Sequence, residues 1–486
     1  MSRHRSTRRK FLKTTGSAAS LAFFAAPFLE VLGGSLGDVL AAPTPYVRPN
    51  VKSSAGQSML TWYAQGIKAM QALPSSNPLN WTNFANIHGS PSGSGPLWNT
   101  CQHGQWWFLP WHRMYLYFLE AAIRKYSNPA FALPFWDYED PTQRALPAAF
   151  RTPATPANVL YVSARNPQIN AGAQLQPSTV STTNAMSKIP FATSASANNF
   201  GSQIVAAPSH LTSPHGALES TPHDAVHVAI GGWMGQVNLA ARDPIFWLHH
   251  ANIDRLWNTW LAMGGGRMDP NNTTWCNQKF TFPNTSGSQT TWPTSGVINA
   301  KTQLGYTYEG QGPTPVQVCG NIVFVPPKFI PEELLKKPEP VRLTDQPVHV
   351  SVAVPPQTKS RALEVARDPK RSTVLRVEGI DVDGPPGVIY EVYVGVPANQ
   401  KAVGSTQNFV GVLAPFGAEG HGDHAEHGTF AAAFPIDAQL ERALTASSNA
   451  FDVQFVPRGL LDANGKELPV QLTGHVTFKT VRLTAE

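Results

Sequence analysis

Side chains that would pack in a core recur at helical spacing in four stretches before residue 265. Residues 59–70, 112–123 and 246–260 carry them at every third or fourth position. Residues 81–87 form a shorter stretch that ends at a His-Gly pair. The pattern predicts four helices that each turn one apolar face toward a shared core.

Two of these helical faces include a histidine. His112 shares its face with Leu116 and Leu119, so its imidazole is expected to point into the core. A histidine satisfied by a backbone carbonyl is the simpler interpretation, and a metal ligand is the alternative. In the last stretch, His249 and His250 lie on rival apolar stripes, so periodicity alone leaves the choice between them open.

Beyond residue 345 the helical spacing gives way to the alternation that is typical of strands. The alternating segments are HVSVAV (349–354), STVLRVEGI (372–380), VIYEVYVGV (388–396), AFDVQFVP (450–457) and VTFKTVRLT (476–484). One short helical run at residues 439–444 interrupts them. The predicted fold class is a mainly α domain, built as a helical bundle, followed by an all-β sandwich or barrel.

Composition sets the expected domain boundaries. Residues 326–345 are dense in proline and lysine, which predicts an extended, exposed linker. This linker would separate a helical domain at 43–325 from a β-rich domain at 346–486. Within the first domain, residues 152–214 are rich in small and polar residues without periodicity, and we expect surface loops there.

Residues 1–42 have the pattern of a twin-arginine export signal. Arg8 and Arg9 precede a modest apolar run, and Ala41 and Ala42 stand where a signal peptidase would cut. We therefore expect a periplasmic or secreted protein. This segment carries a net charge of +4, so the remainder keeps only +2 of the total of +6. Charge gives no reason to expect a nucleic-acid partner, and no stretch is long and apolar enough to predict a membrane span.

Histidines gather around the predicted helices in two groups. His223 and His227 stand four residues apart, which places both imidazoles on one side of a helix. The first group is His88, His103 and His112, and the second is His223, His227 and one of the pair at 249 and 250. Imidazoles without thiolates or carboxylates suit copper, zinc, iron or nickel rather than calcium or magnesium. Three ligands per ion leave a position open for chemistry.

These histidines stand in motifs that closely resemble the tyrosinase and polyphenol oxidase family. The motifs are His88, Cys-x-His at 101–103, PWHR at 110–113, PHxxVH at 222–227 and DPIFWLHHANIDRLW at 243–257. The resemblance implies two copper ions, the first held by His88, His103 and His112 and the second by His223, His227 and His250. It also implies that His249 is packed beside the ligands.

The resemblance extends to residues near the predicted coppers. Glu219 and Asp224 match a glutamate and a residue that is often asparagine, which are thought to hold the water that deprotonates phenols, so a catalytic role is expected for both. Asp224 suits a second interpretation equally well, a capping box with Thr221 as N-cap of the helix. Val237 matches the family position that overlooks the coppers. Phe246 lies one turn before His250, where it would stack on that ring or on substrate, although an ordinary core phenylalanine is the simpler interpretation.

Three cysteines make an odd number in a chain that is expected to be exported. We hypothesise that Cys276 and Cys319 form a disulfide. The Cys-x-His pattern of similar fungal and molluscan enzymes implies that Cys101 is joined to the ring of His103 by a thioether bond. Such a bond would fix one imidazole in place.

The β-rich domain is similar to the C-terminal domain of plant polyphenol oxidases, which shields the copper site until it is removed. A passive stabilising domain is the alternative interpretation. Tyr306 and Tyr308 match a tyrosine motif that closes the catalytic domain of the plant enzymes. A Gly-rich loop carries His421, His424 and His427, which would either load copper transiently or form an exposed loop without metal.

Four further polar residues are assigned structural or surface positions. His210 and His215 lack helical partners, and we expect both at the surface. Asp254 and Arg255 are adjacent on the last helix, and we expect them to form a pair that anchors it.

The resemblance implies oxidation of phenols and o-diphenols to o-quinones by dioxygen, as in a tyrosinase or catechol oxidase. A hemocyanin-like dioxygen carrier would use the same histidines. An oxidase restricted to catechols or o-aminophenols is a further alternative. A dizinc hydrolase is disfavoured, because such sites usually include bridging carboxylates and none stands beside these histidines.

Overall fold

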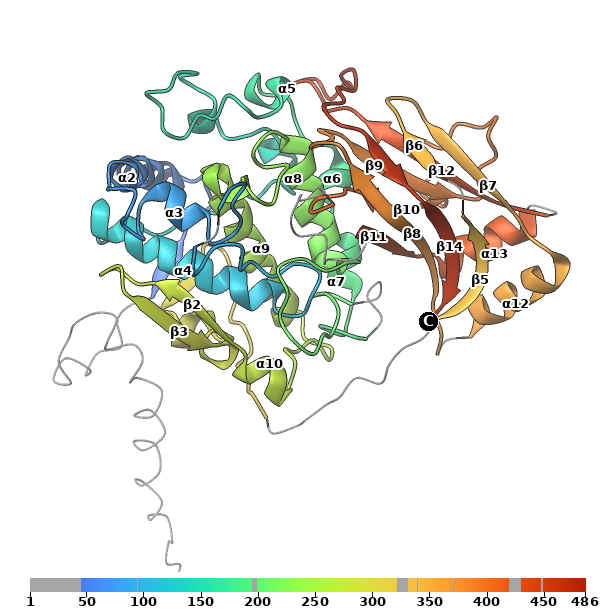
Figure 1. The fold of residues 1–486 in the computed structure, drawn as a ribbon, viewed down its shortest axis with the longest axis horizontal. Coiled ribbons are helices and arrows are strands. Elements are labelled where there is room, and N and C mark those ends of the chain that lie inside the picture. Colours follow the sequence, from blue (N-terminus) through green and yellow to red (C-terminus); the bar gives the residue numbers. More distant parts are fainter. Residues whose placement is uncertain are drawn as a thin grey trace, which may run out of the picture.

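Two bodies of secondary structure lie side by side in the computed structural model, one mainly helical and one built on β-sheets (Figure 1). The structure describes residues 45–93, 95–194, 199–320, 331–338, 340–368, 370–418, 430–446 and 449–486. The predicted export signal and the loop with His421, His424 and His427 lie outside these residues. Within them, no helix has the length and apolar character needed to cross a membrane.

Four helices of the first body coincide with the stretches that the apolar pattern predicts. They are α2 (Ser54–Gln71), α3 (Trp81–Ala85), α4 (Phe108–Tyr126) and α9 (Ile245–Ala262). Helix α2 begins where the Ser53 hydroxyl accepts a hydrogen bond from the Gly56 amide at 3.1 Å. The predicted helices are confirmed: α2 buries one apolar face, whereas α4 and α9 are buried on nearly all sides.

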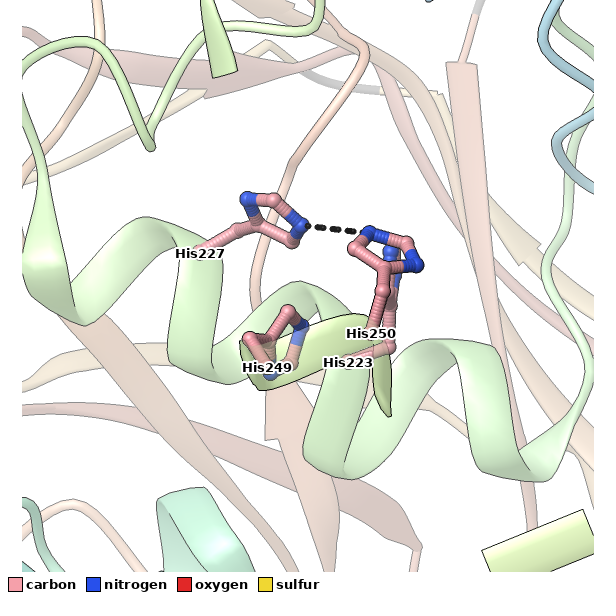
Figure 2. A group of neighbouring side chains, drawn as sticks. All are labelled: His223, His227, His249 and His250. Atoms are coloured by element: carbon pink, nitrogen blue, oxygen red, sulfur yellow. Dashed lines mark hydrogen bonds between the residues drawn. The ribbon is translucent and has the colours of Figure 1, made fainter. Parts of the chain in front are cut away.

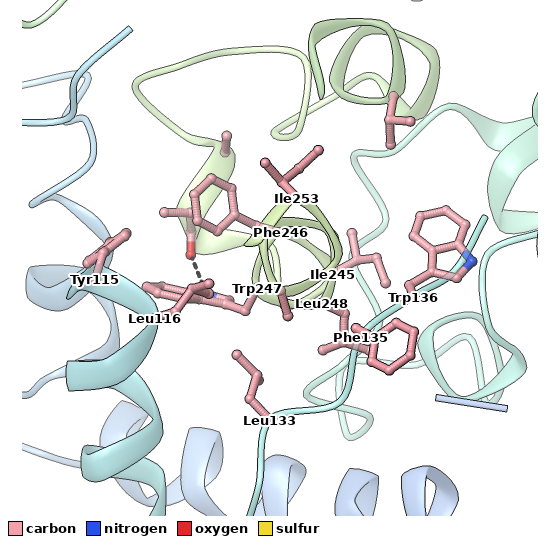
Figure 3. Packing of buried hydrophobic residues seen from close by; sticks show 14 of the residues in the cluster. Tyr115, Leu116, Leu133, Phe135, Trp136, Ile245, Phe246, Trp247, Leu248 and Ile253 are labelled. Atoms are coloured by element: carbon pink, nitrogen blue, oxygen red, sulfur yellow. Dashed lines mark hydrogen bonds between the residues drawn. The ribbon is translucent and has the colours of Figure 1, made fainter. Parts of the chain in front are cut away.

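Helices α4 and α9 pack against each other at the centre of the helical body (Figure 3). The Tyr115 ring on α4 lies 4.4 Å from the Trp247 ring on α9, measured between centroids. Trp247 also donates its indole N–H to the Ala241 carbonyl at 3.1 Å. Aromatic contacts of this kind fix the relative orientation of the two helices that carry His112 and His250.

A buried ion network ties α9 to both ends of the helical body. Asp254 accepts hydrogen bonds from Arg113 at 2.5 Å and Arg48 at 3.3 Å. The hydroxyls of Tyr306 and Tyr308 each donate to its carboxylate at 2.6 Å. These tyrosines form strand β4 (Tyr306–Tyr308), which pairs in parallel with β1 (Tyr46–Arg48). The tyrosine motif therefore joins the end of the helical body to its beginning.

The predicted pairing of Asp254 with Arg255 is wrong. Arg255 lies on the other side of α9, where it donates to Asp137 at 2.9 Å and to Asn252 at 2.8 Å. Adjacent residues of a helix point about 100° apart, so the two side chains reach different partners.

The remaining elements of the helical body are short. The helices are α5 (Pro167–Asn170), α6 (Pro177–Val180), α7 (Thr183–Ser187), α8 (Ala225–Ile230), α10 (Thr273–Asn277) and α11 (Ala300–Gln303), and the strands are β2 (Lys279–Pro283) and β3 (Gln289–Pro293). Single 3-10 turns lie at Pro141–Gln143, Ala148–Phe150, Ala240–Arg242 and Thr294–Gly296. Residues 152–214 are mostly loops, but they are not all superficial, since Leu175 and Phe200 are fully buried.

The second body contains two sheets. In one sheet the strand order is β10-β9-β12-β7, and in the other it is β5-β14-β8-β13-β6, with β11 paired to β8. The strands are β5 (Glu332–Lys337), β6 (Val341–Leu343), β7 (Val348–Ala353), β8 (Thr373–Val382), β9 (Ile389–Val394), β10 (Phe409–Leu413), β11 (Phe430–Pro435), β12 (Ala450–Arg458), β13 (Val476–Phe478) and β14 (Thr480–Ala485). All five segments predicted to be strands lie in these sheets.

Two predictions for this body need correction. Helix α13 (Asp437–Ala446) confirms the helical run predicted at 439–444, but α12 (Pro356–Arg367) was not predicted, and since both pack on the sheets the domain is not all-β. The predicted linker at 326–345 is wrong from residue 332, because β5 pairs with β14 and β6 pairs with β13. In β5 the buried residues Leu334 and Leu335 are adjacent, so the segment lacks the alternation of apolar and polar residues that predicts a strand.

The two bodies share a continuous apolar contact. Ile389, Val412 and Phe416 of the β-rich body are buried in the same apolar cluster as α4 and α9. Polar contacts cross the interface as well: Gln176 donates to the Gly459 carbonyl at 2.7 Å, and the Ala431 amide donates to Ser213 at 3.0 Å. In Figure 1, helix α8 and strand β9 lie at this boundary.

Candidate metal centre

The six predicted ligand histidines come together at the end of the helical body that faces the β-rich body. His88 follows α3, His103 lies in the loop before α4, and His112 and His250 project from α4 and α9. His223 lies in the kinked turn Glu219–Asp224, and His227 follows on α8. Each of the six side chains is at most 3% exposed. Distant segments of the chain thus build one buried cluster.

Three of the histidines are oriented by backbone carbonyls. His88 donates from Nδ1 to the Val237 carbonyl at 2.9 Å, and His112 donates to Phe108 at 2.8 Å. His227 donates to Met234 at 2.7 Å. A carbonyl only accepts, so Nδ1 carries the proton in each ring. The lone pair is then on Nε2, which is the atom that a metal would use.

Two further histidines are oriented by carboxylates. His103 donates from Nδ1 to Glu219 at 2.9 Å, and His223 donates to Asp224 at 2.8 Å. Carboxylate–histidine pairs of this kind fix the ring and make the imidazole a stronger ligand. Each predicted half-site therefore contains one carboxylate-bound ring.

The Nε2 atoms of different histidines approach one another closely. The two Nε2 atoms of His88 and His103 lie 3.2 Å apart, and those of His227 and His250 lie 3.4 Å apart (Figure 2). Where Nδ1 holds the proton of a neutral ring, Nε2 presents a lone pair, and two facing lone pairs repel. A cation between the rings removes this repulsion, so the donor set fits metal ions.

Burial keeps these imidazoles neutral. It lowers the pKa of His112 to about 3 and holds the pKa of His88 and His223 well below the usual histidine range. Neighbouring imidazoles lower the pKa of His88 and His223 further. Neutral imidazole is the form that binds metal ions, so the rings are ready for coordination at neutral pH.

His249 lies within the same cluster. The ligand atoms of His223, His227, His249 and His250 all lie within 4.8 Å of one another, and so do those of His88, His112 and His250. His250 alone belongs to both groups of described residues. His249 is fully buried, and neither of its ring nitrogens has a hydrogen-bond partner in the described part of the chain. Distance alone therefore does not separate the two histidines, and the choice of His250 stays a prediction.

The backbone at the start of the helix that carries His227 agrees with the prediction. Thr221 has extended backbone angles (φ −151°, ψ 121°), the usual conformation of an N-cap residue, and Asp224 and Ala225 are helical. The end is as predicted, because Gly231 adopts φ +66° directly after the last helical residue.

Asp224 does not take part in a capping box. Its two carboxylate oxygens accept hydrogen bonds from two histidines, His223 at 2.8 Å and His215 at 2.7 Å. It therefore acts on ligand geometry rather than on the backbone of the helix.

His215 is buried, so its predicted surface position is wrong. Its side chain is 5% exposed, and a contact to the carboxylate of Asp224 accounts for its burial. The pairing spans nine residues across an irregular turn, where no periodicity connects the two positions. Burial alone would lower the pKa of His215, but Asp224 and Glu219 raise it to about 9.

Glu219 is fully buried and its oxygens are saturated with donors. Besides His103, it accepts from the Gly104 amide at 2.9 and 3.0 Å and from the Ser202 hydroxyl at 2.6 Å. Burial raises the pKa of its carboxyl above the usual range; Asp224 adds to the rise and His215 opposes it. These contacts hold the loop of His103 against the turn of His223.

The two predicted pocket residues lie at different parts of the cluster. The Phe246 ring contacts both histidine groups, with its centroid 4.1 Å from His250 and 4.9 Å from His88. Val237 is buried and holds His88 through its carbonyl. Phe246 therefore packs between the half-sites, and Val237 acts on the centre through its backbone.

The cysteines occupy two different settings. Cys276 and Cys319 form a disulfide with an S–S distance of 2.09 Å. Cys101 is a free, buried cysteine whose Sγ lies 3.2 Å from Nδ1 of His210 and within 4.8 Å of a ring nitrogen of His103. The predicted thioether between Cys101 and His103 stays a prediction.

A residue of the β-rich body covers the cluster. Phe416, in the loop after β10, is fully buried and stacks on His227 at 4.1 Å with an interplanar angle of 14°. Its centroid also lies 5.7 Å from that of His223 and 5.8 Å from that of His103. Sequence analysis missed this residue, because it stands in a loop without periodicity, more than 160 positions from the histidines that it covers.

The chain is similar to known copper enzymes over most of its length. The common central domain of tyrosinase matches residues 78–263, and a domain of unknown function matches residues 332–471. A tyrosinase of Hahella sp. is 30% identical over 74% of this chain and 83% of its own length. A chloroplastic polyphenol oxidase of Malus domestica is 29% identical over 68% of this chain and 62% of its own length.

Solved structures share the whole architecture. Latent apple tyrosinase superposes with a TM-score of 0.62 over 92% of this chain and 98% of its own length, at 22% identity. A latent aurone synthase superposes with a TM-score of 0.61 over 91% of this chain and 90% of its own length, at 20% identity. The match to the Hahella enzyme, together with the central-domain match that spans the histidine cluster, shows that this chain belongs to the tyrosinase and polyphenol oxidase family.

Proposed function

We propose that this protein is a type-3 copper oxidase that converts phenols or o-diphenols to o-quinones with dioxygen. One observation carries the proposal: imidazoles oriented through Nδ1 turn their Nε2 atoms toward each other in a buried cluster. His88, His103 and His112 would hold one copper ion, and His223, His227 and His250 the other. The named relatives are phenol oxidases, and none of them supports an oxygen carrier.

Bound copper would supply the exchange of two electrons with dioxygen. The contribution of the chain is orientation and exclusion of water. Carbonyls and carboxylates fix five of the six predicted ligand rings, all but His250, before any metal arrives, so little rearrangement of these rings accompanies binding. Phe246 keeps the space between the half-sites apolar.

The predicted catalytic role of Glu219 and Asp224 in phenol deprotonation gains no support from their contacts. Their carboxylates accept hydrogen bonds from His103, His223, His215 and the Gly104 amide. Oxidation of o-diphenols is therefore the reaction that the site supports best, and hydroxylation of monophenols would need a further base.

Oxygen uptake by the copper-loaded protein, cleaved between residues 321 and 330, tests the proposal. Continuous consumption of dioxygen with catechol is expected, and the same trace with the matching monophenol decides between a tyrosinase and a catechol oxidase. Oxygen uptake with o-aminophenol, compared with uptake with catechol, tests whether the enzyme is restricted to o-aminophenols. Uptake that stops at one dioxygen per two coppers would indicate a carrier and contradict the proposal.

We propose in addition that the β-rich body shields the centre. The stacking of Phe416 on His227 supports this, because the ring covers one side of the histidine cluster and also contacts His223 and His103. Cleavage between residues 321 and 330, upstream of β5, tests it. Higher activity after cleavage is expected, whereas unchanged activity would leave the domain with a stabilising role only.

Two proposals rest on residues outside the described part of the chain. Twin-arginine export predicts that replacing Arg8 and Arg9 by lysine retains the protein in the cytoplasm, which cell fractionation measures.

Transient copper loading by His421, His424 and His427 predicts slower copper uptake when all three are replaced by alanine. Uptake at the wild-type rate would contradict it.

A further inference from the structure

We propose that His215 is a positioning residue of the metal centre, which holds the carboxylates that orient one ligand histidine in each half-site. The inference rests on the proposed function, since it takes His103 and His223 as copper ligands. No sequence motif marks His215, and its role follows from three sets of contacts: those to the carboxylates, those that place its own loop, and those that cover it.

The carboxylate contacts form a chain from His215 to a ligand. His215 donates from Nδ1 to one oxygen of Asp224 at 2.7 Å, and the other oxygen accepts from His223 at 2.8 Å. One carboxylate thus bridges two imidazoles, and its orientation is set from both sides. Without His215, one oxygen of a buried Asp224 would lose its donor and the side chain could turn away from His223.

His215 also reaches the other half-site. Its Nδ1 lies 3.8 Å from Glu219, the carboxylate that accepts from His103. His215 therefore lies beside both carboxylates that orient a predicted ligand ring.

The loop around His215 is built to keep the ring in place. Gly216 donates its amide to the Ser202 hydroxyl at 2.7 Å, and Ser202 in turn donates to Glu219. A Cβ at position 216 would lie 2.2 Å from the Ser202 amide nitrogen, so only glycine fits here. The backbone beside His215 is therefore fixed to the same carboxylate network.

The β-rich body covers this network as well. The Phe430 ring meets His215 edge-on at 5.2 Å, and the Ala431 amide donates to Ser213 at 3.0 Å. His215 is thereby excluded from water, which strengthens its interaction with Asp224.

The test compares three substitutions in the full chain. In His215→Asn the amide can replace Nδ1 as a donor to Asp224, whereas His215→Phe removes the donor and His215→Ser is too short to reach. His349→Phe is the matched control, since His349 forms a histidine–aspartate pair with Asp452 at 3.1 Å, in the strands β7 and β12 away from the centre. Copper affinity is measured by titration of the copper-free protein against a chelator, and urea unfolding reports whether each variant is folded.

His215→Phe is expected to weaken copper binding about 10- to 100-fold, which is usual for the loss of a residue that orients a ligand. The weaker ion should be the one that His223 holds, and the absorption spectrum of the copper(II) protein should change. His215→Asn should bind within about threefold of the wild type, as should His349→Phe. If the phenylalanine variant does not fold, His215→Ser takes its place with the same expectation.

Unchanged affinity in His215→Phe or His215→Ser, in a wild type that binds two coppers, overturns the inference and leaves the proposed function intact. An asparagine variant as weak as the phenylalanine variant also overturns it, because positioning requires only the hydrogen bond. A wild-type chain that takes up no copper instead refutes the proposed function, and with it the inference.

Discussion

Adjacent histidines on one helix make different contacts here, and this difference is testable. The Nε2 atoms of His250 and His227 lie 3.4 Å apart, and a ring nitrogen of His250 also lies within 4.8 Å of one on His88 and one on His112. Neither ring nitrogen of His249 has a hydrogen-bond partner in the described residues. We expect His250→Ala to lower bound copper from two ions per chain to one and to abolish oxidase activity. We expect His249→Ala to keep two. Metal analysis after gel filtration measures both.

The two variants serve as controls for each other. Both side chains are at most 1% exposed and stand on α9, so truncation leaves a similar cavity in each case. Loss of one copper in His249→Ala with retention in His250→Ala would reverse the ligand assignment.

A second residue-scale prediction concerns the carboxylate that anchors α9. Burial alone would raise the pKa of Asp254, but Arg113 and Arg48 lower it below the usual range. Its carboxylate therefore stabilises the fold above the unfolded pKa of about 3.9, and this stabilisation is lost as the pH falls through the lower folded pKa. Asp254→Asn removes the carboxylate paired with buried Arg113, while Arg48 keeps its ion pair with Glu120, and the substitution should cost about 3–5 kcal/mol at pH 7.

The stability difference between the copper-free wild type and Asp254→Asn should be largest near neutral pH and should shrink below pH 4. Urea unfolding at a series of pH values measures it. A difference that stays constant across this range would show that the loss comes from packing alone and not from the charge of Asp254.

Residue identity and residue orientation differ in how far the sequence determines them. The six histidines could be predicted because each stands in a long motif or on an apolar stripe. Their hydrogen-bond acceptors could not: the carbonyl that orients His88 lies 149 positions away, and the carboxylate that orients His103 lies 116 positions away. Such pairings arise only when the chain is folded, and His215 was misplaced for the same reason.

At the scale of elements, the spacing of apolar residues predicted the long helices. Helices α4 and α9 could be predicted from the spacing of their core residues, although both are buried on nearly all sides. The turn before α8 is too short and irregular for such a pattern, and its geometry depends on contacts to His103 and His215 through carboxylates. Strand β5 was mistaken for a linker because its lysines and flanking prolines resemble one, while its pairing with β14 is set by the other end of the chain.

The disulfide gives an element-scale prediction. It joins Cys276 on α10 to Cys319 across 43 positions, a segment that includes the β2–β3 hairpin and β4. A cross-link of this span limits the unfolded chain and is expected to contribute about 4 kcal/mol. The double variant Cys276→Ser, Cys319→Ser should unfold at correspondingly lower urea concentration.

The wild type treated with a reductant during unfolding is the control, and it should match the double variant. Cys101→Ser, which leaves the disulfide intact, should retain the wild-type midpoint more closely. A double variant as stable as the wild type would show that folding does not depend on this bond.

At the scale of the whole molecule, the interface between the two bodies controls access to the histidine cluster. Phe416 belongs in sequence to the β-rich body, yet it is buried among the histidines and joins the apolar cluster of the helical body. The loop that carries it lies close to Val237, since a Cβ at Gly417 would be 3.6 Å from Val237 Cγ2. The access of a substrate to the centre therefore depends on how the β-rich body is seated.

Phe416→Ala tests this dependence without cleavage. Removing the ring opens a cavity on the order of 100–150 Å³, comparable to engineered apolar cavities that admit benzene, so a small catechol should reach the face of His227. We expect the uncleaved variant to oxidise catechol at least roughly tenfold faster than the uncleaved wild type, and to lose about 3 kcal/mol of stability. Cleavage should then activate the variant less than it activates the wild type.

Phe409→Ala is the matched control, because Phe409 stands on β10 and packs against Tyr393 rather than on the histidines. If folded, copper-loaded Phe416→Ala is no faster than the wild type, Phe416 does not limit access to the centre.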